Sequence, residues 1–137
     1  MPFDGNGWDR AELVPYAETK AQIEDVHGPL QALDDDPHAT AQTFTRPGWR
    51  GRVGFVASMT APFCAGCNRL RVTADGALKV CLFGRREVSL RDAMRDGATD
   101  ADLLALVRQS LAGKARAHAG MDTLAAAENR PMITIGG

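Results

Sequence analysis

The sequence predicts an α+β fold in which helices pack on a small antiparallel sheet. Three observations lead to this prediction. A hairpin pattern surrounds Asp75-Gly76, two segments with helix-capping residues follow it, and an earlier helical segment begins at Pro15. The length of 137 residues and the apolar content of 45% are typical of a globular protein with a modest core.

The first element that we expect is a helix from Pro15. Residues 1–10 are rich in turn-forming pairs, so the chain should begin in irregular structure, and we interpret this start as cut. In the helix, Tyr16, Ile23 and Val26 are spaced to share a face, and Gly28-Pro29 should stop it.

The sequence "ALDDDPHATAQTFTRPGW" is then interpreted as a connector, with residues 34–36 in a solvated acidic loop. Partial alternation in residues 53–57 favours a strand that leads towards the cysteines.

The hairpin has two competing registers. Arg69, Arg71 and Thr73 alternate with Leu70 and Val72, and a second strand is expected from Leu78 to Phe83. A three-residue loop, Ala74-Asp75-Gly76, would pair Thr73 with Ala77 and Arg69 with Cys81. A two-residue turn would send Cys81 to the opposite face. We predict the three-residue loop, with Gly76 left-handed.

Two helices are expected after the hairpin. Ser89 and Asp92 resemble a capping box at the start of a short helix that Gly97 ends, and Thr99 with Asp102 starts a longer one. The longer helix is predicted to reach Gly120, with Lys114, Arg116 and His118 in its last turn. The tail "ENRPMITIGG" should be extended.

The charge distribution indicates a small anionic ligand. The net charge is −1, residues 1–36 carry nine acidic and two basic side chains, and residues 64–95 carry seven basic and three acidic ones. We therefore expect neither nucleic acid nor membrane as a partner. The sequence shows no membrane-spanning run and no signal peptide pattern, which predicts a cytoplasmic location.

The stretch "FCAGCNRLRVTADGALKVCLFG" contains all three cysteines, in the spacing Cys64-x2-Cys67-x13-Cys81. Four uses compete: a Cys3His zinc site, a redox CxxC, three buried structural thiols, and an iron-sulfur cluster with one iron open to another ligand. No histidine has a conventional zinc spacing, and no βαβ pattern supports a redox motif. Arg69 and Arg71 would suit a phosphorylated ligand at an open iron, or they are simply an exposed strand face.

The stretch "GFVASMTAPFCAGCNRLRVTADGALKVCLFG", together with the terminal "PMITIGG", closely resembles the C-terminal part of the GTP 3′,8-cyclase family of molybdenum cofactor biosynthesis. These are radical S-adenosylmethionine enzymes. "MPFDGNGW" also resembles the end of a late barrel strand in that family. The resemblance runs along essentially the whole chain.

The resemblance implies the following site. Cys64, Cys67 and Cys81 would ligate a [4Fe-4S] cluster whose open iron takes the guanine of GTP. The segment Arg69, Leu70 and Arg71 would contact GTP, Met1 would lie against S-adenosylmethionine, and Gly136 and Gly137 would form a tail that enters the active site.

The resemblance also implies an incomplete enzyme, because the family's CxxxCxxC motif, which holds the S-adenosylmethionine-cleaving cluster, does not occur here. We expect a C-terminal extension of a TIM-type barrel: residues 1–30 as a barrel remnant and 31–137 as the cluster and GTP domain. The implied partners are GTP and either a second copy of the chain or a radical S-adenosylmethionine barrel half. The competing hypothesis is a small structural zinc module that mediates protein contacts.

Overall fold

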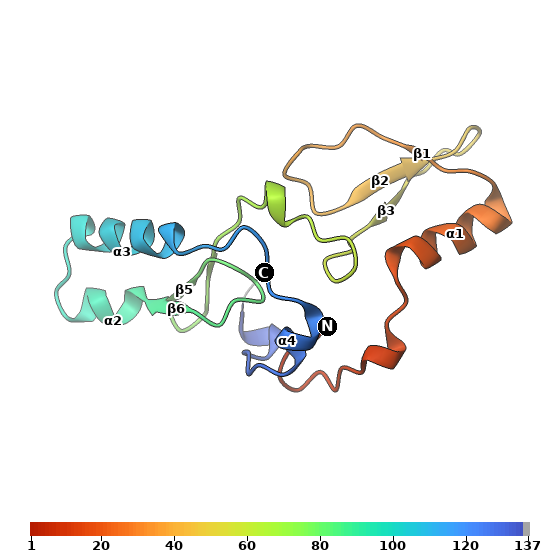
Figure 1. Cartoon of the computed structure of the whole chain (residues 1–137). Coiled ribbons are helices and arrows are strands. Elements are labelled where there is room, and N and C mark those ends of the chain that lie inside the picture. The colour runs from red at the N-terminus through yellow and green to blue at the C-terminus, as the bar shows by residue number, and fades with distance from the viewer. Residues whose placement is uncertain (136–137) are drawn as a thin grey trace. The chain divides into compact units, whose positions relative to one another are not determined.

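The computed structural model describes residues 1–135 and confirms an α+β fold built from two small antiparallel sheets and short helices (Figure 1). The chain forms two compact units. Residues 9–67 make one, named here the middle unit, and residues 1–8 with 68–137 make the other, named the terminal unit. None of the helices within the described part of the chain is long and apolar enough to span a membrane.

The middle unit consists of one helix and one three-stranded sheet. Its elements are the 3-10 turn η1 (Arg10–Glu12), α1 (Tyr16–His27), β1 (Gln31–Ala32), β2 (Gln42–Thr45), β3 (Val53–Phe55) and the 3-10 turn η2 (Cys64–Gly66). The strands are antiparallel in the order β1-β2-β3.

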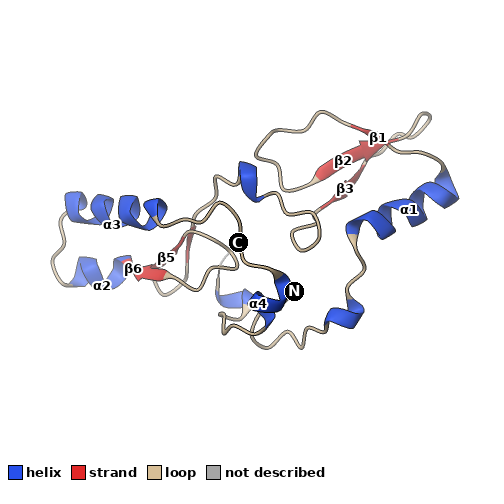
Figure 2. Cartoon of the chain, viewed as in Figure 1, coloured by secondary structure: helices blue, strands red, loops and turns tan. Residues whose placement is uncertain are grey.

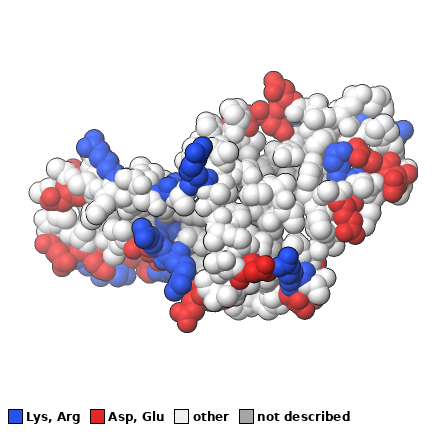
Figure 3. Space-filling model, viewed as in Figure 1, with Lys and Arg blue, Asp and Glu red and all other residues white. Residues whose placement is uncertain are grey.

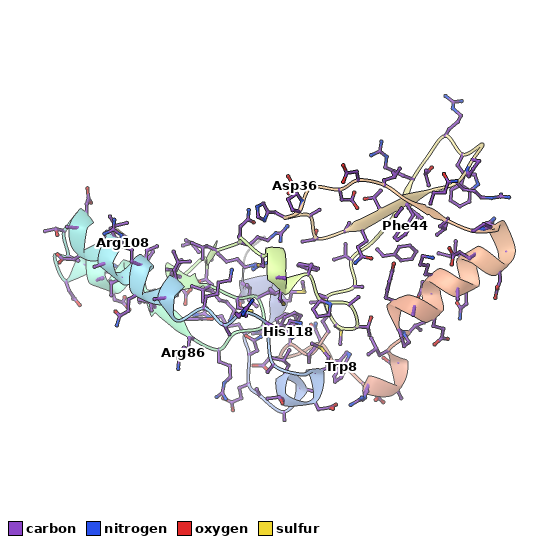
Figure 4. The ribbon with its side chains drawn as sticks, turned by 45° about the horizontal axis from the view of Figure 1, so that its top comes forward. Trp8, Asp36, Phe44, Arg86, Arg108 and His118 are labelled. Carbon is purple, nitrogen blue, oxygen red and sulfur yellow. The ribbon has the colours of Figure 1, made fainter. Side chains whose placement is uncertain are left out.

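Aromatic contacts hold the middle unit together. Phe44 of β2 is 7% exposed, and its ring meets that of Phe55 edge-on at 5.6 Å (Figure 4). Tyr16 of α1 meets Phe55 in the same way at 5.3 Å. One aromatic row therefore joins α1 to β3 and the central strand β2.

The terminal unit contains the second sheet and the other helices. Its elements are β4 (Arg71–Val72), β5 (Ala77–Lys79), β6 (Glu87–Ser89), α2 (Leu90–Arg95), α3 (Asp100–Ala112), α4 (Met121–Ala125) and the 3-10 turn η3 (Met132–Thr134). Figure 2 shows how much loop joins these short elements.

The core of the terminal unit brings together both ends of the described chain. Phe3, Phe83, Leu124 and Ile135 form one buried cluster, in which Ile135 is only 1% exposed. Phe3 and Phe83 stack with ring centroids 5.5 Å apart. The turn-rich start of the chain is irregular, as expected, but Phe3 anchors it in a core that the sequence did not reveal.

The predicted hairpin register is confirmed. Arg71 pairs with Lys79 and Val72 with Leu78, the Thr73 amide donates to the Ala77 carbonyl at 2.9 Å, and Gly76 has φ +81°. This is the three-residue loop. The ladder itself ends at Arg71 and Lys79, so β5 is shorter than the predicted second strand.

Two further expectations about the first half of the chain have clear outcomes. The helix from Pro15 is confirmed as α1, with Val26 left 76% exposed. The connector, residues 32–49, is wrong, because it contains β2 and the last residue of β1. The acidic loop is also more ordered than expected, since Asp35 accepts a hydrogen bond from the Thr43 amide at 2.6 Å and the hydrogen bonds from Thr43 lower the pKa of Asp35.

The second half departs from prediction at its helix ends. The capped starts at Ser89 and Thr99 are confirmed, and Thr99 forms a reciprocal capping box. However, α3 stops at Ala112 with Gly113 as its C-cap, because glycine is a poor helix former and here its amide bonds Gln109 and Leu111 in a tightened last turn. The predicted basic last turn therefore lies outside the helix.

The tail also differs from the extended segment that we predicted. A short helix, α4, precedes it, and residues 132–134 form η3, closed by a hydrogen bond from the Ile135 amide to the Met132 carbonyl. Burial of Ile135 provides the reason, because a tight turn directs this side chain into the core. Gly136 and Gly137 lie outside the described residues.

Candidate metal and nucleotide site

The CxxC motif forms a tight turn at the end of the middle unit. Cys64 begins η2, and the Cys67 amide donates to the Cys64 carbonyl at 3.1 Å. Both side chains are half-buried. A 3-10 turn of this kind presents two thiols from adjacent positions, which is the arrangement that CxxC ligands need.

Two residues of the β1–β2 loop pack directly on this turn. His38 Nδ1 lies 2.8 Å from the Gly66 carbonyl oxygen. Because a carbonyl only accepts, Nδ1 carries the proton in this contact. A Cβ at Gly66 would overlap the carbonyl oxygen of Pro37, so glycine is required by close approach of two backbones.

Cys81 lies in the terminal unit, on a turn of its own. The Gly84 amide donates to the Cys81 carbonyl at 3.2 Å, and a Cβ at Gly84 would come within 3.1 Å of the Cys81 Cβ. Phe83 at the centre of this turn is buried, and its ring lies 4.8 Å from the ring of His118. His118 thus packs on the cysteine turn instead of completing a helix end.

Two other predicted site positions belong to the same neighbourhood. Met1 and Cys81 are both half-buried and pack on the cluster that contains Phe83 and Ile135. Ile135 is the last residue before the predicted Gly-Gly tail. The terminal unit therefore gathers Met1, Cys81 and the base of the tail around one core.

The predicted GTP-contacting segment leads into β4. Arg69 and Arg71 are half-buried, whereas Leu70 is 40% exposed. Lys114 donates to the Arg69 carbonyl at 3.1 Å, which fixes the backbone of this segment. Thr73 is 3% exposed and Val72 is 60% exposed, so the polar face of the strand is the one that the unit covers.

A pocket of about 480 Å³ adjoins Cys81 in the terminal unit. Phe83 and Leu124 form part of its wall, and Arg86 and His118 add polar groups (Figure 4). This volume is that of a small-molecule site. Arg69 and Arg71 do not line it, so the predicted triphosphate contacts and this pocket do not coincide.

The three thiols are divided between the two units of the described structure. Across residues 1–135, no three His, Cys, Asp or Glu side chains are placed to hold one metal ion. Cys64 and Cys67 belong to the middle unit and Cys81 to the terminal unit, and none of the three is in a disulfide. Cysteine thiolates are the usual ligands of iron-sulfur clusters, so these three residues are chemically suited to hold one. Their convergence on a single cluster stays a prediction.

Acidic and basic side chains both occur on the face that Figure 3 shows. Arg130, from outside the basic segment 64–95, pairs with two of its three acidic residues, with Glu87 at 2.7 Å and with Asp75 at 2.8 Å.

Sequence reasoning missed two residues beside the cysteines. His38 was given no role, although its contact with the CxxC turn is direct. Lys79 lies within the predicted strand from Leu78 to Phe83, and its full burial was not predicted. Only the burial of Lys79 could have been found from the sequence, because the confirmed register places Lys79 on the same face as Thr73 and Arg71.

Comparison with known proteins identifies the chain. Residues 1–120 match the family model described as Molybdenum Cofactor Synthesis C. The chain belongs to this family. A GTP 3′,8-cyclase, mitochondrial, of Arabidopsis thaliana is 51% identical over 137 residues, which are 100% of this chain and 35% of that protein.

Two further relatives show the same partial coverage. The molybdenum cofactor biosynthesis protein 1 of Mus musculus is 48% identical over 99% of this chain and 21% of its own length. A GTP 3′,8-cyclase of Rhodopirellula baltica is 44% identical over 90% of this chain and 35% of its own length. The chain thus spans about a third or less of these relatives, and it corresponds to a C-terminal part of them.

Proposed function

We propose that this chain is the GTP-binding, iron-sulfur part of a GTP 3′,8-cyclase, a lyase that converts GTP to (8S)-3′,8-cyclo-7,8-dihydroguanosine 5′-triphosphate. The observation that carries the proposal is the family match over residues 1–120, which includes all three cysteines and both arginines. The relatives whose names state this activity cover the cysteine region as well.

The proposed ligands of a [4Fe-4S] cluster are Cys64, Cys67 and Cys81. Two features support them: both cysteine turns hold their thiols half-buried, and no described thiol is lost to a disulfide. The cluster would supply one iron with an open position for the guanine. The chain's own part in this scheme is to hold the base there and to exclude water from it.

Arg69 and Arg71 are the proposed partners of the triphosphate, with Leu70 between them. Guanidinium groups bind phosphate oxygens in pairs, and both side chains keep part of their surface exposed. Lys114 supports this role indirectly, because its hydrogen bond to the Arg69 carbonyl fixes the backbone of the segment that carries both arginines.

We further propose that turnover needs a radical S-adenosylmethionine barrel in addition to these residues. The sequence holds no CxxxCxxC motif, the motif that binds the S-adenosylmethionine-cleaving cluster in the family that the chain resembles. In this proposal residues 1–30 adjoin that barrel and 31–137 form the substrate domain. Met1 would contact S-adenosylmethionine, and Gly136 and Gly137 would reach the active site. The barrel would supply the 5′-deoxyadenosyl radical that takes the C3′ hydrogen of GTP, and this chain would hold the nucleotide with C3′ next to C8.

A ligand comparison tests the role of the arginines. On anaerobically reconstituted protein, Arg71→Ala should weaken GTP binding about tenfold or more in calorimetry and leave guanosine binding nearly unchanged, because only the triphosphate meets the guanidinium. The matched control is Arg108→Ala on α3, which is exposed and should change neither ligand. Equal loss of both ligands in Arg71→Ala would contradict the assigned role.

A mixing experiment tests the need for a barrel. The chain combined with a separately produced radical S-adenosylmethionine barrel half of the family should form a complex and convert GTP, whereas neither half alone should do so. Conversion of GTP by this chain alone would overturn the proposal that turnover needs the barrel.

A further inference from the structure

Lys79 is a fully buried lysine whose ammonium group has three oxygen acceptors. Its side chain is 0% exposed. Nζ donates to the Gly84 carbonyl, to Asn129 Oδ1 at 3.2 Å and to Glu87 Oε1 at 3.3 Å. A buried cation is costly unless it is paired and hydrogen-bonded, and all three protons of this ammonium find oxygens.

Lys79 belongs to a network of two cations and two carboxylates. Glu87 is 18% exposed and also accepts from Arg130, and Arg130 in turn bonds Asp75 on the hairpin loop. Two cations and two carboxylates thus form one chain of contacts. It links β5, β6 and the hairpin loop to the residues that lead into the C-terminal tail.

The same network reaches the other end of the protein. The Asn129 amide donates to Asp4 Oδ1 at 3.2 Å, and Asp4 directly follows the buried Phe3. Asn129 therefore connects the two segments, because its side-chain Oδ1 accepts from Lys79 and its backbone amide donates to Asp4. No helix or strand provides this connection.

The hydrogen bond from Lys79 to the Gly84 carbonyl connects Lys79 with the turn that carries Cys81. Gly84 closes the turn that carries Cys81, since its amide bonds the Cys81 carbonyl. The turn is crowded, with Gly84 packed against the Cys81 side chain. The Lys79 ammonium thus holds the far end of a short turn whose near end is the cysteine.

We propose that Lys79 is a positioning residue for the Cys81 thiol. Its ammonium fixes the Cys81–Gly84 turn to Asn129 and so sets where the Cys81 thiol points. That this positioning serves an iron-sulfur cluster rests on the proposed function. The effect of Lys79 on the Cys81 turn does not depend on a cluster.

Thiol labelling tests the positioning directly. In a Cys64→Ala/Cys67→Ala background, Cys81 is the sole thiol of the full chain, and its labelling by 5,5′-dithiobis(2-nitrobenzoic acid) is followed at increasing urea. Lys79→Met should accelerate labelling about tenfold, as loss of a charged hydrogen bond predicts. Lys79→Arg, which keeps the charge and donors, should restore most of the slow rate. Lys20→Met is the matched control, because Lys20 pairs with Glu24 in the middle unit.

The urea dependence separates positioning from stability. A local release of the turn gives a labelling rate that hardly changes at low urea, whereas labelling through global unfolding rises steeply with urea. Fast, urea-insensitive labelling in Lys79→Met with rescue by Lys79→Arg supports the proposal. An unchanged rate, or acceleration with the urea dependence of global unfolding, would overturn it.

A second variant keeps the test decisive if Lys79→Met does not fold. Lys79→Met/Glu87→Gln removes one charge of each sign, while Arg130 keeps Asp75 as its partner, and it still lacks the donor to Gly84. The same labelling criteria apply to it. Iron and sulfide content of the unmutated chain is measured separately, so failure to bind a cluster would reject the proposed function without deciding the role of Lys79.

Discussion

The two turns that carry the cysteines are held by different forces. Pro37 and His38 contact the CxxC turn of the middle unit from an exposed loop, through one close backbone approach and one hydrogen bond. The Cys81 turn rests on a buried aromatic core and a buried lysine network. The CxxC turn should therefore respond to substitutions that create a local steric clash, and the Cys81 turn to substitutions that change core packing or charge.

The largest effect should come from Phe83→Ala. Phe83 is 5% exposed, stacks on Phe3 and meets the His118 ring at a tilt, so its truncation should cost about 3–5 kcal/mol of unfolding free energy. Urea unfolding of the cluster-free, reduced chain measures it, with Trp8 as reporter of the terminal unit in a Trp49→Phe background. A loss below about 1 kcal/mol would mean that this core does not support the Cys81 turn.

The counterpart in the middle unit is Gly66→Ala. The added methyl would overlap the Pro37 carbonyl, so the CxxC turn and the loop must separate, at a cost of about 1–3 kcal/mol. Trp49 in a Trp8→Phe background reports this unit. Gly51→Ala is the matched control, because a Cβ there meets nothing within 4 Å. If both variants unfolded at the same urea concentration, the close approach would be refuted.

A smaller effect is expected from His38. His38→Leu removes the donor to the Gly66 carbonyl and should cost about 0.5–1.5 kcal/mol in the same unfolding measurement. His38→Asn retains a donor at a similar position and should recover most of this loss. Equal destabilisation by the two variants would show that the hydrogen bond is not the relevant contact.

The smallest effect is pH-dependent and belongs to the terminal unit. Hydrogen bonds from Arg130 and then Thr73 lower the pKa of Asp75 from 3.8 to about 2. Because the folded pKa is depressed, the ionised form favours folding: its contribution is complete above about pH 4 and is lost as pH falls through 2. Asp75→Asn should flatten the stability profile of the cluster-free chain between these values. A profile identical to that of the unmutated chain would contradict the pairing.

The parts of the fold that could be predicted depend on local chemistry. Gly76 supplies the positive φ of the hairpin loop, and Ser89 and Thr99 cap helices within three residues of themselves. Each of these signals lies within a few residues of the turn or helix that it specifies, so the hairpin register and both helix starts were predicted correctly.

The rest depends on distant partners. Phe44 makes β2 a buried strand only because Phe55 and α1 cover it, and Lys79 is satisfied by Asn129, fifty residues later in the chain. No local pattern contains such information. The cysteine spacing indicated a site, whereas the residues that hold the cysteines in place became visible only in three dimensions.

The central claim is that the three cysteines hold an iron-sulfur cluster that meets GTP. The direct test is the iron, acid-labile sulfide and zinc content of anaerobically reconstituted chain, with electron paramagnetic resonance spectra of the reduced protein with and without GTP. About four irons and four sulfides per chain and a spectrum that GTP changes are the predicted result. One zinc per chain without sulfide, or a cluster spectrum that GTP leaves unchanged, would contradict the claim.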